Sequence, residues 1–465
     1  MVQINDSEMK WKELCDRYLP LTESDSIWRY NDYTNNKLPS QGWKIHISAN
    51  LNNAVDIFKT IGPLLSELDV SFKGVKSLIE LKKINCGLFY GYSQVGKCFT
   101  IYPKNIPQLL LITDKLEKET ARFTGPKVPY DLQNNNSSII HFRYGAFTSL
   151  SLGNSNEDKV PAIRNPQGIL VPDNREGSAV PEWIKIPKNL SVKENSFISK
   201  VLATQYIPYK VLSQRGKGGV YLALNLSNIP PSLCILKEGR KNGETDWDGK
   251  DGYWRINHEA EVLNNLNSLG VLVPKVKDTF IIQESFYVAL EYIEGENLQS
   301  VVEKPISLEQ ALYLSLEVAR LVHQLHVSGW IWRDCKPPNM ILTRSGIIPV
   351  DFEGACKITQ PEKSQWGTTG YIPPEFYNNR GRYEANIAQD LYALGATLHQ
   401  IYSGQTPSTN KLKPIGRLRY NVPPIIRNII NSLLSIEPNK RPSAKYVVDV
   451  LEEVKGTEMQ HFYLG

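Results

Sequence analysis

The stretch that decides the fold is Ile331-Trp-Arg-Asp-Cys-Lys-Pro-Pro-Asn-Met-Ile-Leu342, followed nine residues later by Asp351-Phe-Glu-Gly354. It lies between apolar runs at 311–327 and 340–350. An Arg-Asp pair in a loop is usually only a surface ion pair or a helix cap, so the prediction depends on the full spacing. That spacing places four polar side chains within reach of one reaction centre: Asp334, Lys336, Asn339 and Asp351.

This spacing resembles the catalytic loop and the metal-binding loop of protein kinases. The resemblance implies that Asp334 accepts the proton of a Ser or Thr hydroxyl and that Lys336 neutralises the transferred phosphoryl group. It also implies that Asn339 and Asp351 hold Mg²⁺ against the phosphates of ATP or GTP. The sequence therefore predicts a phosphotransferase.

The segment at 209–224 predicts a strand, a turn and a second strand. Glycines in hairpin turns are more often just turns, so the signal depends on the strand and the helix that come next in the chain. Lys237, in that predicted strand, stands where kinases carry the phosphate-binding lysine. Its ion-pair partner is expected on the helix, with Glu259 as first choice and Glu261 as the reserve. The bare backbone of the turn could lie over nucleotide phosphates at three glycines: Gly216, Gly218 and Gly219.

Two further segments extend the kinase resemblance. The run at 288–295 resembles the hinge between kinase lobes, where backbone groups from Glu291 to Ile293 would meet the nucleotide base. The insert at 241–253 is dense in glycine and charge, and we expect an exposed loop there.

Later motifs match structural positions of a kinase. Glu375 of the Pro-Pro-Glu motif and Arg441 resemble two charged residues that pair with each other in kinases. A buried charge is tolerable only when it is paired, so we expect these two to form an ion pair. Asp390 resembles the buried aspartate at the start of a central helix. Two positions depart from the pattern. Trp332 stands where eukaryotic kinases usually carry His, which should alter packing more than chemistry, and Glu353 lacks the torsional freedom of the usual Gly.

Composition describes an ordinary globular protein, with 465 residues, 41% apolar residues and 22% charged residues. The net charge of +5 is too small to indicate nucleic acid or a membrane as partner. No early apolar run is long enough for a signal peptide or a membrane span, so the cytoplasm is the expected location. The six cysteines form no C-x-x-C pair or Cys/His cluster, so neither structural zinc nor a disulfide framework is expected.

The region before the kinase-like part alternates strands and helices in an α+β or α/β manner. In Gly42-Trp-Lys-Ile-His-Ile-Ser48 the alternation turns Lys44 and His46 to the same face, away from the core. His141 and Arg143 share a face in a later predicted strand. Aromatic residues in 1–40 follow no clear period, which indicates a partly ordered arm. We expect a first domain at 1–190 that includes this arm, a linker at 191–200 and a bilobal kinase-like domain at 201–465.

Cationic side chains lie at or beside the predicted strands of the first domain. If they converge, they suit a phosphate dianion, because cations bind it, a protonated imidazole gives the leaving oxygen a proton and an amine removes a Cα proton. A lysine is a base at neutral pH only if its pKa of ~10.4 falls by about three. Surface lysines are usually only solvated, so composition alone does not show convergence. The candidates are Lys44, His46, Lys73, Lys97 and Arg143, with His141 as a further one.

Several runs resemble the amino-terminal lyase domain of class III lanthipeptide synthetases, which is similar to bacterial phosphothreonine lyases. They include 42–49, Phe72-Lys73, 96–103, 123–126 and 142–147. The resemblance covers residues from about 40 to 455, with the lyase before the kinase. It implies that Lys73 is the general base and His46 the general acid. It also implies phosphate-binding cations, which would be Lys44, Lys97 and Arg143.

The fold expected is therefore α+β with two catalytic domains, a phosphothreonine-lyase-like α/β domain and a bilobal kinase-like domain. The resemblance implies a dehydratase that phosphorylates Ser or Thr of a precursor peptide and then eliminates phosphate. The family's third domain, a cyclase, is not found. Either the chain is truncated, or the protein makes dehydrated peptide and leaves ring closure to another protein or to unassisted chemistry. No nucleic acid or membrane partner is expected, and a dimer is possible. Two alternatives stay open: a stand-alone Ser/Thr kinase with a regulatory or binding first domain, and a pseudokinase scaffold that presents peptides.

Overall fold

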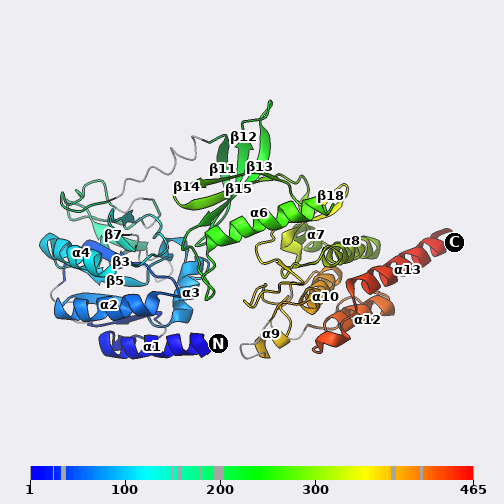
Figure 1. The fold of residues 1–465 in the computed structure, drawn as a ribbon, viewed down its shortest axis with the longest axis horizontal. Coiled ribbons are helices and arrows are strands. Elements are labelled where there is room, and N and C mark those ends of the chain that lie inside the picture. The colour runs from blue at the N-terminus through cyan, green and yellow to red at the C-terminus, as the bar shows by residue number, and fades with distance from the viewer. Residues whose placement is uncertain are drawn as a thin grey trace. The chain divides into compact units, whose positions relative to one another are not determined.

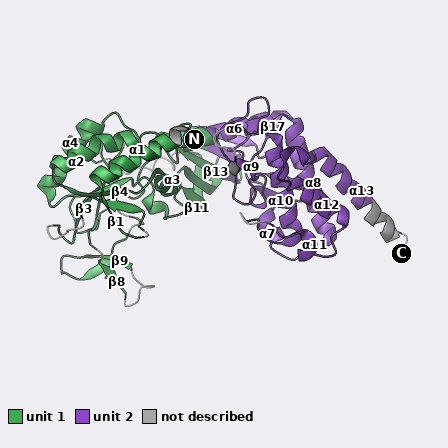
Figure 2. Ribbon diagram, turned by 90° about the horizontal axis from the view of Figure 1, so that it is seen from below, with its two compact units in different colours: residues 1–232, 236–256, 280–287 green, residues 233–235, 257–279, 288–465 purple. Residues whose placement is uncertain are grey.

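The computed structural model describes residues 2–24, 26–32, 38–137, 139–148, 150–153, 160–174, 176–177, 180–192, 204–378, 384–408 and 412–463, with backbone alone at 2–4 and 457–463. It divides into two compact units (Figure 2). Unit 1 comprises residues 1–232, 236–256 and 280–287, and unit 2 comprises 233–235, 257–279 and 288–465. Most of the linker expected at 191–200 lies outside the described residues, so that boundary stays a prediction.

Unit 1 contains a seven-stranded sheet in the order β1-β2-β4-β5-β3-β7-β6, in which every neighbouring pair is antiparallel. Its elements are α1 (Val2–Tyr18), β1 (Leu21–Thr22), β2 (Trp28–Tyr30), β3 (Gln41–Ile47), α2 (Ala54–Glu67), β4 (Ser71–Val75), α3 (Leu78–Cys86), η2 (Tyr92–Gln94), β5 (Phe99–Tyr102), α4 (Ile106–Thr120), β6 (Leu132–Gln133) and β7 (Ile140–Ala146). The strand predicted from the alternation at 42–48 is confirmed as β3, and the strand predicted to hold His141 and Arg143 is confirmed as β7.

Helices α1, α2 and α4 contribute to one apolar core with one face of this sheet (Figure 1). The core face is set by strand alternation, because Ile45, Ile47 and Ile101 point into it while their neighbours point away. The N-terminal arm expected at residues 1–40 contains a regular helix at residues 2–18. Its Trp11 is fully buried and donates its indole N–H to the Val75 carbonyl oxygen at 3.1 Å. The weak apolar period of the sequence hid a helix that is held by tertiary packing.

Two smaller sheets follow along the chain. The first contains β10 (Leu170–Pro172), β9 (Val160–Arg164) and β8 (Ser151–Leu152), in that spatial order. The second has five strands in the order β11-β12-β13-β15-β14, with bounds β11 (Tyr206–Arg215), β12 (Gly218–Asn225), β13 (Ser232–Arg240), β14 (Val276–Ile282) and β15 (Ser285–Glu291).

The insert after β13 is not the exposed loop that its composition predicted. Trp247 packs against the core of the first domain, and Thr245 is buried. Asn52 Nδ2 donates to the Asp246 carbonyl oxygen at 3.0 Å, and Thr124 Oγ1 donates to Asn242 Oδ1 at 3.2 Å. Glycine and charge favour turns, but here the turns are covered by a neighbouring surface that is distant in sequence.

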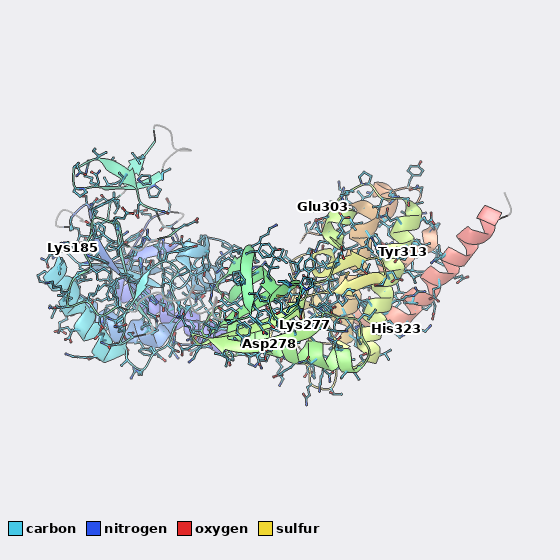
Figure 3. The ribbon with its side chains drawn as sticks, turned by 90° about the horizontal axis from the view of Figure 1, so that it is seen from above. Lys185, Lys277, Asp278, Glu303, Tyr313 and His323 are labelled. Atoms are coloured by element: carbon cyan, nitrogen blue, oxygen red, sulfur yellow. The ribbon has the colours of Figure 1, made fainter. Side chains whose placement is uncertain are left out.

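Unit 2 is mainly helical. Helices α8 and α10 bury most of their apolar residues, and α8 begins at the cap Ser307, whose side chain accepts the Gln310 N–H. Tyr313 and His323 lie on α8 and Glu303 follows α7, as labelled in Figure 3. The elements are α6 (Gly252–Ser268, which begins in unit 1), β16 (Glu296–Asn297), α7 (Leu298–Val302), α8 (Leu308–Val327), β17 (Trp330–Ile331), η3 (Pro337–Asn339), β18 (Met340–Thr343), β19 (Gly346–Pro349), β20 (Cys356–Lys357), α9 (Glu375–Asn378), α10 (Ile387–Ser403), α11 (Ile415–Leu418), α12 (Pro424–Leu433), η4 (Pro438–Lys440) and α13 (Ala444–Tyr463).

Candidate active sites

The face of the seven-stranded sheet opposite the apolar core carries a row of polar side chains. His46 on β3 is directly opposite Thr100 on β5 and His141 on β7. Thr100 is in turn opposite Lys73 on β4. Residues directly opposite one another in a sheet point to the same side, so register alone brings these four side chains to one face. Lys44 and Arg143, which are also opposite each other, join the same face because each lies two residues away from a member of the row.

His46 is held by a carboxylate that the sequence analysis did not single out. Asp131, just before β6, lies 2.5 Å from His46 Nδ1 and 3.9 Å from Lys97 Nζ, and all three side chains are buried. Burial lowers the pKa of His46 to about 3, and the nearby Lys97 and Lys44 act in the same direction. Burial alone would raise the pKa of Asp131, but Lys97 and His46 hold it below its usual value. At neutral pH the pair is therefore a neutral imidazole that donates its Nδ1–H to an ionised carboxylate.

Arg143 is a buried cation with an unused donor. Its Nη2 lies 3.2 Å from Asp173 Oδ1 and donates to the Asn174 carbonyl oxygen at 2.6 Å. Its Nη1 is buried and has no hydrogen-bond partner among the residues that the structure describes. An unsatisfied guanidinium N–H inside a protein is unfavourable, and an anionic ligand would satisfy it.

The other two lysines of this face lie against aromatic rings. Lys73 Nζ is 4.3 Å from the centre of the Trp28 ring, and Lys44 Nζ is 5.9 Å from the centre of the Tyr102 ring. The face of an aromatic ring attracts a cation electrostatically, so such contacts orient a lysine. His141 Nε2 accepts the backbone N–H of Val128 at 3.3 Å, which assigns the proton of this imidazole to Nδ1.

In unit 2, the catalytic loop forms a closed set of hydrogen bonds around Asp334. Lys336 Nζ lies 2.7 Å from Asp334 Oδ2, and Asn339 Nδ2 donates to the same oxygen at 2.9 Å. Thr368 Oγ1 donates to Asp334 Oδ1 at 2.7 Å and receives a hydrogen bond from Lys336 at 2.5 Å. Because Asn339 uses its NH₂ group toward Asp334, its amide oxygen is left as a ligand for a cation.

The loop predicted to bind metal contacts Trp332, the residue that stands where kinases usually carry His. Its indole N–H donates to the Asp351 carbonyl oxygen at 2.9 Å, and its ring stacks on Phe352 with centroids 5.6 Å apart. Asp351 adopts a φ of +86°, a conformation that favours glycine, so these contacts hold a strained residue. Glu259 is fully buried and its Oε1 accepts the Phe352 N–H at 3.0 Å. Glu353 is buried as well.

The predicted nucleotide-binding residues lie in both units. Lys237 is buried on β13 in unit 1. Glu259 and Glu261 are in unit 2, where Glu261 is exposed and accepts a hydrogen bond from Asn257, so the reserve choice points to solvent. In the hinge-like run the Glu291 N–H donates to the Lys275 carbonyl oxygen at 2.9 Å. Ile293 follows β15 in the same unit. The three glycines form a tight hairpin, in which β11 and β12 pair up to Arg215 and Gly218 around a two-residue turn.

The predicted structural pair of unit 2 is present. Arg441 Nη1 and Nη2 donate to the two oxygens of Glu375 at 2.6 and 2.7 Å, and the Arg441 side chain is completely buried. Asp390, on α10, accepts the backbone N–H groups of Trp332 and Arg333 at 2.8 and 2.7 Å. This contact ties the catalytic loop to the central helix.

Three residues of these sites were missed by sequence reasoning. Thr368 lies in the run Gly367-Thr-Thr-Gly370, just before the Pro-Pro-Glu motif, and the sequence analysis gave neither threonine a role. Asp131 lies just before β6 and Asp173 just after β10, and neither carries a local pattern that links it to His46 or Arg143. A buried carboxylate beside a buried cation is visible only once the chain is folded.

Two family models match the chain. Residues 20–197 match the RamC N-terminal domain. Residues 215–450 match the protein kinase domain, which is 236 of 465 residues and thus just over half of the chain. The chain belongs to the protein kinase family. In this kinase a RamC N-terminal domain precedes the kinase domain, which implies a phosphotransferase that binds a nucleotide.

The kinase is distantly similar to several known proteins. It is 28% identical over 376 residues to a probable SapB synthase of Streptomyces coelicolor, and the matched residues cover 77% of this chain and 39% of that protein. It is 27% identical over 280 residues to a probable serine/threonine-protein kinase of Clostridium perfringens, covering 56% and 39% of the two chains. It is 28% identical over 284 residues to serine/threonine-protein kinase F of Synechocystis, covering 56% and 57%. The chain thus spans about two fifths to three fifths of the length of these relatives.

Within the described part of this kinase, none of the helices is both long enough and apolar enough to cross a membrane. The same residues contain no group of three or more His, Cys, Asp or Glu side chains placed to hold a metal ion.

Proposed function

We propose that this kinase is a bifunctional dehydratase of the class III lanthipeptide synthetase type. The kinase domain phosphorylates Ser or Thr hydroxyls of a precursor peptide, and the first domain eliminates the phosphate to leave dehydroalanine or dehydrobutyrine. Hydroxide is a poor leaving group and phosphate a good one, so the two steps belong together chemically. Two active domains on one chain also raise the effective concentration of the phosphorylated intermediate.

In the phosphorylation step, Asp334 orients the substrate hydroxyl and accepts its proton, and Lys336 neutralises the phosphoryl group. Thr368 bonds to both residues and holds them in place. Lys237 binds phosphates of ATP or GTP. Mg²⁺, which shields the phosphate charge when bound, would be held by Asp351 and Asn339, whose carboxylate and amide oxygens are ligands of the kind that it prefers.

In the elimination step, the phosphate of phosphoserine or phosphothreonine binds among Lys44, Lys97 and Arg143. Neutral Lys73 takes the Cα proton, the electron pair forms the Cα–Cβ double bond, and the Cβ–O bond breaks as phosphate leaves. The arriving phosphate brings negative charge to the buried face and raises the pKa of His46, so that the imidazole can carry the proton needed by the leaving oxygen.

One observation carries the lyase half of this proposal. The strand register gathers Lys44, His46, Lys73 and Arg143 on one sheet face, and these are the groups that would bind a phosphate dianion and move its protons. The buried and unsatisfied Nη1 of Arg143 supports the same ligand, because a phosphate oxygen is the kind of acceptor it lacks. The implied partner is a precursor peptide.

The two half-reactions can be tested separately. A candidate precursor peptide encoded beside this chain would be incubated with ATP or GTP and Mg²⁺ and weighed by mass spectrometry. We expect loss of water with the wild type, retained phosphate with Lys73→Ala and no change with Asp334→Asn. A synthetic phosphothreonine peptide supplied directly should lose phosphate with Asp334→Asn but not with Lys73→Ala. Phosphate gain in both wild type and Lys73→Ala would leave a kinase whose first domain only binds or regulates.

A further inference from the structure

The tip of the glycine-rich hairpin is fixed by the first domain. The Gly216 N–H donates to the Cys86 carbonyl oxygen at 3.1 Å. A Cβ atom on Gly216 would come within 1.7 Å of the Asn85 carbonyl oxygen, so only glycine allows this approach. On the kinase side, the Arg240 N–H donates to the Lys217 carbonyl oxygen at 2.8 Å. The polar backbone of the turn is therefore held from both sides, and one side belongs to the RamC-like domain.

Tyr92 adds a side chain to this contact. Its hydroxyl accepts a hydrogen bond from Gln214 Nε2 at 3.0 Å and another from Arg240 Nη1, whose guanidinium lies 5.3 Å from the centre of the Tyr92 ring. Arg240 in turn donates to both oxygens of Glu238 at 2.9 and 2.7 Å. Glu238 is buried and directly follows Lys237 on β13. Tyr92 thus contacts β11, which leads into the turn, and β13, the strand that carries Lys237.

The surface that presents Tyr92 is well defined. Helix α3 begins at the cap Ser77, whose side chain accepts the Glu80 N–H, and it ends at Gly87 with a φ of +79°. Asn85 Oδ1 then accepts the Gly96 N–H at 3.2 Å, which ties the end of α3 to the residue before Lys97. The contact to the hairpin therefore comes from a part of the first domain that is itself fixed.

We propose that Tyr92 is a positioning residue for nucleotide binding, which it serves by restraining the glycine-rich turn and Arg240. This rests on the proposed function in one respect, that the turn and Lys237 contact nucleotide phosphates. A restrained turn loses less conformational freedom when it closes on a ligand, and binding is tighter for that reason. Loss of the hydroxyl removes the acceptor for Gln214 Nε2 and for Arg240 Nη1, which keeps only its hydrogen bond to the Arg215 carbonyl oxygen at 3.3 Å, and this weakens the restraint.

The test compares Tyr92→Phe with Tyr90→Phe. Tyr90 is a half-buried tyrosine two residues away, and its hydroxyl donates to Glu80 within the first domain, so this variant loses a hydroxyl without touching the hairpin contact. Titration of the full chain with ADP and Mg²⁺ by calorimetry should give a Kd about three- to tenfold higher for Tyr92→Phe. This is less than the full contribution of a hydrogen bond to a charged group, because Tyr92 acts on the nucleotide only through the turn. Tyr90→Phe should match the wild type.

A second readout separates this role from a general loss of folding. Amide hydrogen exchange at 212–220, measured without nucleotide, should be faster in Tyr92→Phe alone, while elimination from a synthetic phosphothreonine peptide stays at the wild-type rate. Equal Kd values and equal exchange in all three proteins would overturn the proposal, as would an equal shift in both variants. A wild-type chain that binds no nucleotide would overturn the kinase step instead, and the exchange comparison would still decide whether Tyr92 restrains the turn.

Discussion

Replacement of Asp131 by Asn is the change that most directly probes the proposed lyase site. The carboxylate lies 2.5 Å from His46 Nδ1 and 3.9 Å from Lys97 Nζ, and its side chain is completely buried. Asn keeps the size and one acceptor oxygen, but it removes the charge. The imidazole then loses the group that stabilises its protonated form, so the proton for the leaving oxygen becomes harder to supply.

The size of the effect follows from that contact. A hydrogen bond to a charged group contributes about 1.5–3 kcal/mol, which corresponds to a loss of about 10- to 150-fold in the rate of elimination. Lys97 should bind phosphate no worse, because the substitution removes the negative charge beside it. We therefore expect kcat to fall while the KM for phosphopeptide is unchanged or lower.

The assay is release of inorganic phosphate from a synthetic phosphothreonine peptide, with kcat and KM measured separately. Asp114→Asn is the matched control, because Asp114 forms an exposed helical pair with Lys118 in the same domain. Removing one partner of a buried pair also costs about 3–5 kcal/mol of stability, so the assay is run at a temperature where circular dichroism shows the variant folded. A kcat within about twofold of the wild type, or a higher KM alone, would refute the role given to Asp131.

Three other outcomes are expected. Arg441→Leu should lower the free energy of unfolding of unit 2 by about 3–5 kcal/mol in a denaturant titration, because Glu375 is left without its partner; an unchanged midpoint would contradict this. Trp332→Phe keeps the stack but loses the N–H, so the Mg²⁺ concentration for half-maximal nucleotide binding should rise about fivefold, and no rise would argue against the indole contact. Burial lowers the pKa of His46 to about 3, and burial lowers the pKa of His399 too. The unfolded state then binds protons that the folded state does not, so stability is full above pH ~6.5 and falls on acidification. The single variants His46→Gln and His399→Gln should each make the melting temperature depend less on pH between about pH 6.5 and 4. An unaltered pH dependence in both variants would contradict this expectation.

The sequence predicted the kinase site because that site is local. Asp334, Lys336, Asn339 and Asp351 lie within 18 residues, so loop geometry alone brings them together. In the first domain, alternation predicted that Lys44 and His46 share a face, since side chains of a strand repeat every two residues. It could not predict which strands are neighbours, and only the order β4-β5-β3-β7 sets Lys73 and Arg143 on either side of His46.

The sequence by itself therefore determined the identity of the chemical groups and their local order: a kinase loop, alternating strands with cations on one side, and a glycine-rich hairpin. Tertiary structure alone decided which carboxylates lie beside His46 and Arg143, because Asp131 and Asp173 reach them from positions next to strand ends far along the chain. It also made a helix of residues 2–18 and set the hairpin tip against Cys86. The physical reason is that burial and ion pairing depend on contacts between segments that are distant in the sequence, and a local stretch of sequence does not specify those contacts.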